Sequence, residues 1–170
     1  MTKEYPKKIW DAGKVSVNGW ISIGNAFSSE IMAAQDYDSI CIDLQHGALH
    51  YSEALSILQA VAPSGIFPFA RVPSLDSGLI GKLLDSGARG IICPMIDTAE
   101  DAAEFVSCLR YPPHGKRSYG PIRAKFFPED SYTSVANESI LAFAMLETER
   151  AVANMGSIIS TPGLAGIYVG

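Results

Sequence analysis

The sequence predicts an α/β fold built from parallel βαβ units, because two kinds of segment alternate along the chain. Short apolar runs rich in β-branched residues are typical of buried strands, and segments of helical length separate them. Open doubly wound sheets and closed barrels share this plan. No G-x-G-x-x-G follows the first strand and no G-x-x-x-x-G-K-[ST] occurs, which weighs against a nucleotide-binding open sheet.

Six strands are expected, at residues 17–24, 37–44, 66–72, 90–95, 140–147 and 165–170. The helices expected between them occupy residues 28–35, 51–62, 74–88, 97–110 and 147–160. The second helix carries Leu55, Leu58 and Val61 near helical spacing. Acids in the first turn of the fourth helix predict an N-cap at Asp97 or Thr98.

Residues 110–132 form one long irregular stretch that breaks the alternation of strands and helices between the fourth and fifth strands. Loops of this length are uncommon and often functional, so a functional loop is one interpretation. A surface loop rich in proline is the other.

The composition indicates one globular domain over residues 1–170, with 48% apolar and 18% charged residues. A net charge of −5 argues against a nucleic-acid partner. Lys3, Lys7 and Lys8 form the one small basic cluster, which is expected on a solvated arm rather than at a membrane surface. No apolar stretch is long enough to span a bilayer.

The three cysteines give no framework for a disulfide or a thiolate zinc site, because their number is odd and no C-x-x-C occurs. Cys41 and Cys93 lie in apolar runs and are predicted to be small buried hydrophobic residues. We therefore expect the protein to reside in a reducing compartment. The N-terminal segment has no apolar signal-peptide core, so a cytoplasmic location is expected.

Polar residues gather where the predicted strands end. In βα folds the catalytic groups collect at the carboxyl ends of the strands. The residues at these ends are Asp43, Gln45 and His46 after the second strand, Arg71 after the third and Glu147 after the fifth. Their common position predicts one pocket that holds them together.

Each of these residues also has a purely structural interpretation. His46 fits a structural histidine, and Asp43 fits a cap on the segment that follows it. Arg71 fits a buried ion pair with a neighbouring acid. Glu147 fits a helix N-terminal acid favoured by the helix dipole. The shared rim, rather than any single residue, favours a functional site.

The residue types at the strand ends are suited to stabilising an enolate. A carboxylate without cysteines or a histidine triad suits a hard cation such as Mg²⁺ or Mn²⁺. Arg71 beside it is able to hold a carboxylate or a developing oxyanion. His46, oriented by an acid three residues earlier, is able to move protons near neutral pH. An H-x-x-x-H metal pair with His50 is disfavoured, because Gly47 and the strand end argue against the necessary helix.

Four ordered motifs resemble the HpcH/HpaI aldolase family, and together they run from about residue 17 to residue 170. They are "ICIDLQHG", "ARVPSLDSGLIGKLLDSGARGIICPMIDTAEDA", "RYPPHGKRSYGPIRA" with Gly115, Arg117 and Gly120, and "MLETERAVANMGSIISTPGLAGIYVG". The resemblance implies a TIM (β/α)8 barrel of the phosphoenolpyruvate/pyruvate superfamily. It also implies a class II, metal-dependent pyruvate aldolase that assembles as a homo-oligomer.

The resemblance implies a role for each matching residue. His46 matches the catalytic base and Asp43 the acid paired with it. Arg71 matches the arginine that binds the ketone oxygen, and Glu147 matches the first of two carboxylate metal ligands. Asp85 matches a supporting acid near the metal waters at a subunit interface.

The implied reaction cleaves or forms a C–C bond in a 4-hydroxy-2-oxo acid, with pyruvate and an aldehyde as the small-molecule partners. The 2-oxo acid chelates a divalent metal, Mg²⁺, Mn²⁺ or Co²⁺, and its carboxylate meets backbone groups that begin at Gly170. The metal and Arg71 stabilise the pyruvate enolate, while His46 shuttles the proton.

The sequence departs from the family pattern at its end. In the family, a proline, one further residue and Asp-Leu follow the sixth strand, and that aspartate is the second metal carboxylate. This sequence ends at Gly170, so a C-terminally incomplete barrel is expected, with about six βα units and without the last two strands and the C-terminal helix. Weak metal binding and poor activity follow unless another chain completes the site. The alternative is an inactive aldolase-like fragment that acts as a folding or interaction module.

Two smaller departures lie inside the site. Met145 stands where many members have glutamine, and Gln45 replaces a glutamate common before the histidine. Both changes are expected to alter the aldehyde preference. A related thioester lyase is a third interpretation, but no basic cluster for coenzyme A is present.

Overall fold

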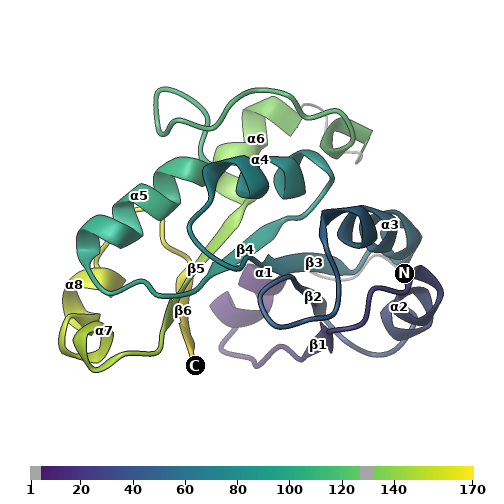
Figure 1. The fold of residues 1–170 in the computed structure, drawn as a ribbon, viewed down its shortest axis with the longest axis horizontal. Coiled ribbons are helices and arrows are strands. Elements are labelled where there is room, and N and C mark those ends of the chain that lie inside the picture. The colour runs from purple at the N-terminus through teal and green to yellow at the C-terminus, as the bar shows by residue number, and fades with distance from the viewer. Residues whose placement is uncertain (1–4, 127–131) are drawn as a thin grey trace.

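The computed structural model describes residues 5–126 and 132–170, and one curved sheet of six parallel strands forms its centre (Figure 1). The strands are β1 Asn18–Ile21, β2 Ser39–Asp43, β3 Phe67–Arg71, β4 Gly90–Cys93, β5 Leu141–Leu146 and β6 Gly166–Val169. Each pairs with the next in sequence order. The sheet curls into part of a TIM barrel, so all six predicted strands and the predicted fold are confirmed.

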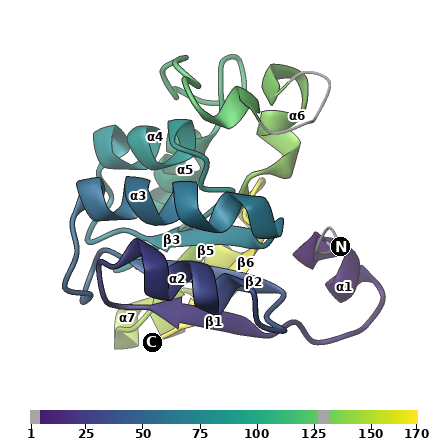
Figure 2. The ribbon, with the colours of Figure 1, turned by 90° about the vertical axis from the view of Figure 1, so that its right-hand side faces the viewer.

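Helices follow the strands and pack on the outer face of the sheet (Figures 1 and 2). They are α2 Ala26–Ala33, α3 Tyr51–Val61, α4 Ser77–Asp85, α5 Ala99–Leu109, α7 Glu149–Ala153 and α8 Met155–Ile159. A 3-10 turn, η1 Ala62–Ser64, extends α3. Thr98, and not Asp97, is the N-cap of α5, because its side chain accepts from the amide of Asp101 at 3.1 Å. The fifth predicted helix is divided at Asn154, whose side chain instead donates to the carbonyl of Asp97.

The core has two layers, because successive side chains of a strand face opposite sides of the sheet. Ile40 and Ile42 of β2 pack outward against the helices. A smaller inner cluster lies on the concave side of the sheet and contains Cys41, Phe67, Phe69, Ile92, Leu141 and Met145. Cys41 and Cys93 are both fully buried, as predicted.

The N-terminal segment forms a short helix, α1 Pro6–Asp11, where the sequence predicted a solvated arm. Lys7 and Lys8 are exposed, as predicted, but the segment that carries them is a packed helix rather than an arm, because Ile9 is buried and the Trp10 ring packs edge-on against Phe143 at 5.8 Å. Lys3 lies outside the described residues. Figure 2 shows α1 near the amino end of β1, apart from α2, α3 and α4.

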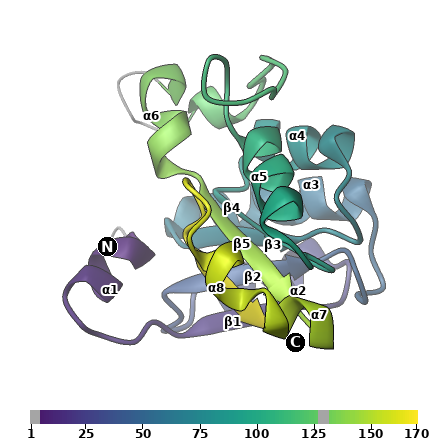
Figure 3. The same cartoon turned by 90° about the vertical axis from the view of Figure 1, so that its left-hand side faces the viewer.

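The irregular stretch contains no strand within its described part, residues 110–126 and 132, but it leads into an unpredicted helix. The 3-10 turn η2 covers Ala124–Phe126 and helix α6 covers Tyr132–Ser139, while residues 127–131 lie outside the described part. Figure 3 shows α6 and α7 at opposite ends of β5. No helix within residues 5–126 and 132–170 has the length and apolar character needed to cross a membrane.

Candidate functional site

A buried ion pair joins the ends of β2 and β3. Asp43 and Arg71 are register partners in the parallel ladder, so both side chains project from the same edge into the concave side of the sheet. Arg71 Nε donates to Asp43 Oδ1 at 2.9 Å, and Arg71 Nη2 donates to Oδ2 at 2.6 Å. Asp43 is 2% exposed and Arg71 is 7% exposed. The bidentate contact fixes the guanidinium in one orientation.

The turn after β2 adds further donors to the Asp43 carboxylate. The backbone amides of Gln45 and His46 donate to Asp43 Oδ1 at 3.1 and 3.2 Å. Trp20 of β1 donates from Nε1 to Oδ2 at 3.2 Å. Gly47 closes the turn, and a Cβ there would lie 2.2 Å from the carbonyl oxygen of Asp43. Asp43 therefore caps this turn as well as pairing with Arg71, and the predicted capping role is confirmed.

These contacts keep Asp43 ionised. Burial alone would raise the pKa of Asp43, but hydrogen bonds from Arg71, Trp20 and the backbone of His46 lower it to about 2. The hydrogen bond to Asp43 raises the pKa of Arg71. Asp43 reaches His46 through the backbone amide, while the imidazole is exposed at the rim. An anion fixed in this way holds Arg71 in place and is poorly suited to accept a proton itself.

A row of contacts continues from Arg71 to the ends of β5 and β6. Arg71 Nη1 approaches the Met145 sulfur at 3.9 Å. A Cβ at Gly170 would lie 2.6 Å from Met145 Cε and 3.2 Å from Glu147 Oε2. Glu147 is exposed. The structure thus brings Arg71, Glu147 and Gly170 to one edge of the sheet, as the strand ends predicted.

Asp85 lies elsewhere. It ends α4, whose chain returns from the carboxyl end of β3 toward the amino end of β4, so it lies at the opposite end of the barrel from Asp43. Its carboxylate pairs with Arg117 Nη2 at 2.7 Å. Gly120 of the predicted signature loop lies beside it, since a Cβ there would be 3.5 Å from Asp85 Oδ2. Within one chain, Asp85 supports the loop rather than the strand-end site.

The metal prediction rests on Glu147. Among the described residues, no group of three or more His, Cys, Asp or Glu side chains has the arrangement of a metal site. Arg71 already engages both oxygens of Asp43. The exposed Glu147 carboxylate suits a hard cation and would supply one ligand of a larger set.

Two features of the site were not predicted. Trp20 contacts both members of the ion pair, since its ring also lies 4.9 Å from the Arg71 guanidinium carbon. In the sequence, the feature that could have indicated this role of Trp20 was its position in the first predicted strand. Gln45 Oε1 is buried and has no hydrogen-bond partner among the described residues, so this residue of the predicted strand-end site has a free acceptor there.

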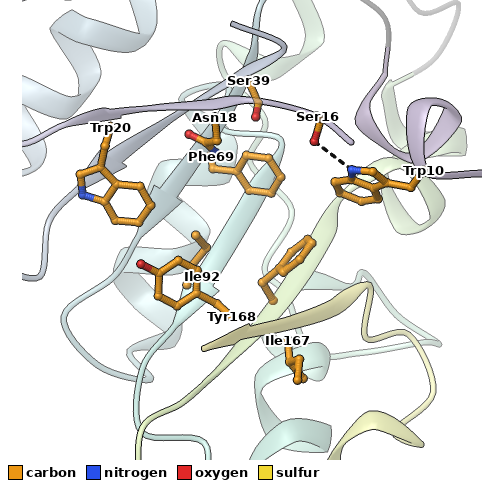
Figure 4. Close-up of a pocket in the computed structure, with 10 residues that line it drawn as sticks. Trp10, Ser16, Asn18, Trp20, Ser39, Phe69, Ile92, Ile167 and Tyr168 are labelled. Atoms are coloured by element: carbon orange, nitrogen blue, oxygen red, sulfur yellow. Dashed lines mark hydrogen bonds between the residues drawn. The ribbon is translucent and has the colours of Figure 1, made fainter. Parts of the chain in front are cut away.

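A cavity of about 300 Å³ lies inside the curve of the sheet (Figure 4). Apolar residues dominate its lining, and Trp10 closes one side with a hydrogen bond from Nε1 to Ser16 Oγ at 2.9 Å. Trp20 and Tyr168 also line it, whereas Asp43, Arg71 and Glu147 do not. The chemistry-bearing residues therefore lie at the rim of the barrel, beyond the apolar cavity.

Comparison with known proteins identifies relatives over most of the chain. The model of the HpcH/HpaI aldolase/citrate lyase family matches residues 18–170. Hydroxypyruvate/pyruvate aldolase of Rhizorhabdus wittichii is 37% identical over 161 residues, which cover 95% of this chain and 64% of that protein. 4-Hydroxy-2-oxovalerate aldolase of Rhodococcus jostii is 33% identical over 166 residues, 96% of this chain and 64% of that protein.

A solved structure has the same architecture. The crystal structure of a HpcH/HpaI aldolase/citrate lyase family protein from Burkholderia cenocepacia superposes with a TM-score of 0.89 at 30% identity. The match covers 99% of this chain and 69% of that one. The chain thus spans somewhat less than two thirds of the length of the two curated aldolases that it matches.

Proposed function

Because the chain belongs to the HpcH/HpaI aldolase/citrate lyase family, we propose that it carries the catalytic residues of an aldolase acting on 4-hydroxy-2-oxo acids. The reaction cleaves or forms a C–C bond through a pyruvate enolate, with an aldehyde as the other partner. The row of contacts from Asp43 through Arg71 and Met145 to Glu147 and Gly170 carries this proposal. The names of the two curated relatives, both 2-oxo-acid aldolases, support the substrate class.

Arg71 is the residue proposed to bind the oxygen that becomes the enolate oxygen. Its Nε and Nη2 are held by Asp43, while Nη1 meets only the weakly accepting sulfur of Met145 among the described contacts. Nη1 is therefore available to a stronger oxygen acceptor. Because Asp43 fixes the guanidinium before the substrate arrives, Arg71 needs little reorganisation to meet the developing negative charge.

His46 is the proposed proton carrier, since its imidazole is exposed at the same rim and imidazole exchanges protons near neutral pH. The backbone at Gly170 is proposed to meet the substrate carboxylate. Glu147 is proposed as one ligand of a divalent cation, Mg²⁺, Mn²⁺ or Co²⁺. When bound, such a cation supplies Lewis-acid polarisation of the two substrate oxygens.

Solvent exchange at pyruvate tests the enolate step without an aldehyde. The 170-residue chain is incubated with pyruvate and Mn²⁺, Mg²⁺ or Co²⁺ in D₂O, and loss of the methyl proton signal is followed by NMR after the metal is removed. Catalysed exchange that disappears in His46→Asn but persists in His50→Asn supports the proposal. His50 is an exposed N-cap residue, and asparagine is a good N-cap, so this control is structurally mild.

Metal binding has its own readout. We expect Mn²⁺ to bind weakly, as followed by its electron paramagnetic resonance signal, and Glu147→Gln to weaken that binding at least tenfold. The matched control is Glu149→Gln, which removes an exposed carboxylate two residues further on. Equal affinity in both variants would remove Glu147 from the proposal.

The alternative, an inactive interaction module, predicts the opposite in both assays. It expects neither Mn²⁺ affinity above that of Glu147→Gln nor exchange of the pyruvate methyl protons. The lack of a complete metal-ligand cluster within the described residues is the observation that favours it. Exchange without bound metal would contradict both interpretations of the site.

We also propose assembly into a homo-oligomer. Asp85 lies at the opposite end of the barrel from Arg71, so its implied role near the metal waters requires the site of a neighbouring subunit. Light scattering during size-exclusion chromatography tests this, with a monomer of 18.2 kDa as the result that would contradict it.

A further inference from the structure

We propose that a cavity at the amino-terminal end of β5 binds a small carboxylate, with Arg110 as its recognition residue. The cavity has a volume of about 400 Å³ and lies between the end of α5, helix α6 and the turn before β6. It is separate from the strand-end site, because α6 precedes β5 whereas Glu147 follows it (Figure 3).

Arg110 is a buried cation that has no counter-charge among the residues the structure describes. It is 7% exposed and lines the cavity. Nη2 donates to the carbonyl of Gly163 at 3.0 Å, but Nη1 is buried and has no hydrogen-bond partner within the described part of the chain. No carboxylate pairs with it within residues 5–126 and 132–170, and burial lowers its pKa. Burying a guanidinium without a counter-charge costs free energy. A bound oxyanion would supply both the missing charge and an acceptor for Nη1.

The walls of the cavity are fixed before any ligand binds. Asn137 of α6 accepts from the amide of Tyr111 at 2.7 Å and donates to its carbonyl at 3.2 Å. Gly115 packs on the backbone of Arg110, where a Cβ would lie 2.6 Å from the Arg110 carbonyl oxygen. Gly163 has a φ of +85°, which turns its carbonyl into place for Arg110 and favours glycine. A rigid frame around an unsatisfied charge is a preorganised binding site.

The rim determines which oxyanion fits. His114 and Thr133 are exposed at the rim and offer further donors beside the guanidinium. Glu138 also lines the cavity and is exposed, so it opposes a second negative charge on the ligand. A carboxylate with one charge therefore fits better than a phosphate dianion. Acetate and inorganic phosphate are the probes that distinguish the two.

The test compares thermal unfolding of the 170-residue chain in acetate, in phosphate and in sodium chloride of equal ionic strength. For the wild type we expect acetate at ten times its dissociation constant to raise Tm by about 3–6 °C. Arg110→Met is expected to lose this rise, and its Tm in chloride is expected to be no lower than that of the wild type. Arg150→Met, which removes an exposed arginine from α7 at the other end of β5, should keep the full rise.

Each outcome bears on the proposal. A rise in Tm with phosphate but not with acetate would mean that the cavity binds phosphate groups, and it would overturn the carboxylate assignment. Equal rises in the wild type and Arg110→Met would overturn the site itself. If Arg110→Met does not fold, NMR of the wild type decides. Acetate should then shift the amides of Tyr111, Asn137 and Gly163, and shifts confined to Asp43 and His46 would contradict the proposal.

Discussion

Removing the charge of Asp43 should cost stability that depends on pH. Asp43→Asn keeps the shape of the side chain and some of its hydrogen bonds, but it leaves the buried Arg71 without its counter-charge. The pKa of Asp43 falls from an ordinary value of 3.8 to about 2 in the folded chain, which corresponds to about 2 kcal/mol of folding free energy at pH 7. The uncompensated guanidinium adds to this loss, toward the 3–5 kcal/mol typical of a broken buried pair.

The sign of the pH dependence follows from the direction of the change. The folded pKa of Asp43 lies below the unfolded value, so the unfolded chain binds more protons in the interval between them. The stabilisation is fully present above about pH 5 and is lost as the pH falls toward 2, with about half of it gone at pH 3. The difference between the wild type and Asp43→Asn should therefore shrink as the solution is acidified.

Urea unfolding followed by tryptophan fluorescence at pH 7, 5 and 3 measures this difference. Asp36→Asn is the control for loss of a surface charge, because Asp36 is exposed, and it should change the free energy of unfolding by less than about 0.5 kcal/mol. A difference between the wild type and Asp43→Asn that is the same at pH 7 and pH 3 would refute the reasoning, since the carboxylate would then not be stabilised as an anion.

Three substitutions and one chemical treatment test the structural frame of the molecule. Thr98→Ala removes the side-chain cap of α5 and should lower the free energy of unfolding by about 1 kcal/mol, as measured by urea unfolding. Gly163→Ala forces a residue with a Cβ to a φ of +85° and should cost about 1–3 kcal/mol, whereas Gly156→Ala, in an open position of α8, should stabilise by about 0.5–1 kcal/mol. Burial raises the pKa of Cys41 and raises that of Cys93 to about 12, so both thiols should resist iodoacetamide at pH 8 until the chain is unfolded.

The strand-end residues could be predicted because strand positions are local information. The period of two places Asp43 and Arg71 on the same face of neighbouring strands, and parallel pairing places both at the carboxyl edge. Their mutual contact was one of two interpretations of Arg71, and the structure confirms the ion pair. The ion pair does not decide between a structural and a catalytic role, because a fixed guanidinium serves both.

The unpredicted elements depend on contacts between distant residues. Helix α6 contains few apolar residues, and the bidentate contact of Asn137 with the backbone of Tyr111 connects it to a segment 26 residues away. The short helix α1 is held by rings that pack against the inner face of the sheet, such as Trp10 against Phe143. Asp85 and Arg117 are 32 residues apart, so no local pattern indicated their pairing.

Arg71 and Arg110 make a final contrast, because both residues are 7% exposed but they differ in what compensates their charge. A carboxylate holds Arg71, whereas among the described residues one carbonyl holds Arg110. The same substitution should therefore change stability in different directions. Arg71→Met leaves the Asp43 anion buried and unpaired and should lower the free energy of unfolding by about 3–5 kcal/mol. Arg110→Met removes an unpaired cation and should leave that free energy unchanged or raise it. Urea unfolding of both variants in chloride buffer at pH 7 measures the contrast. Equal losses in the two variants would mean that burial alone, rather than charge compensation, determines the cost.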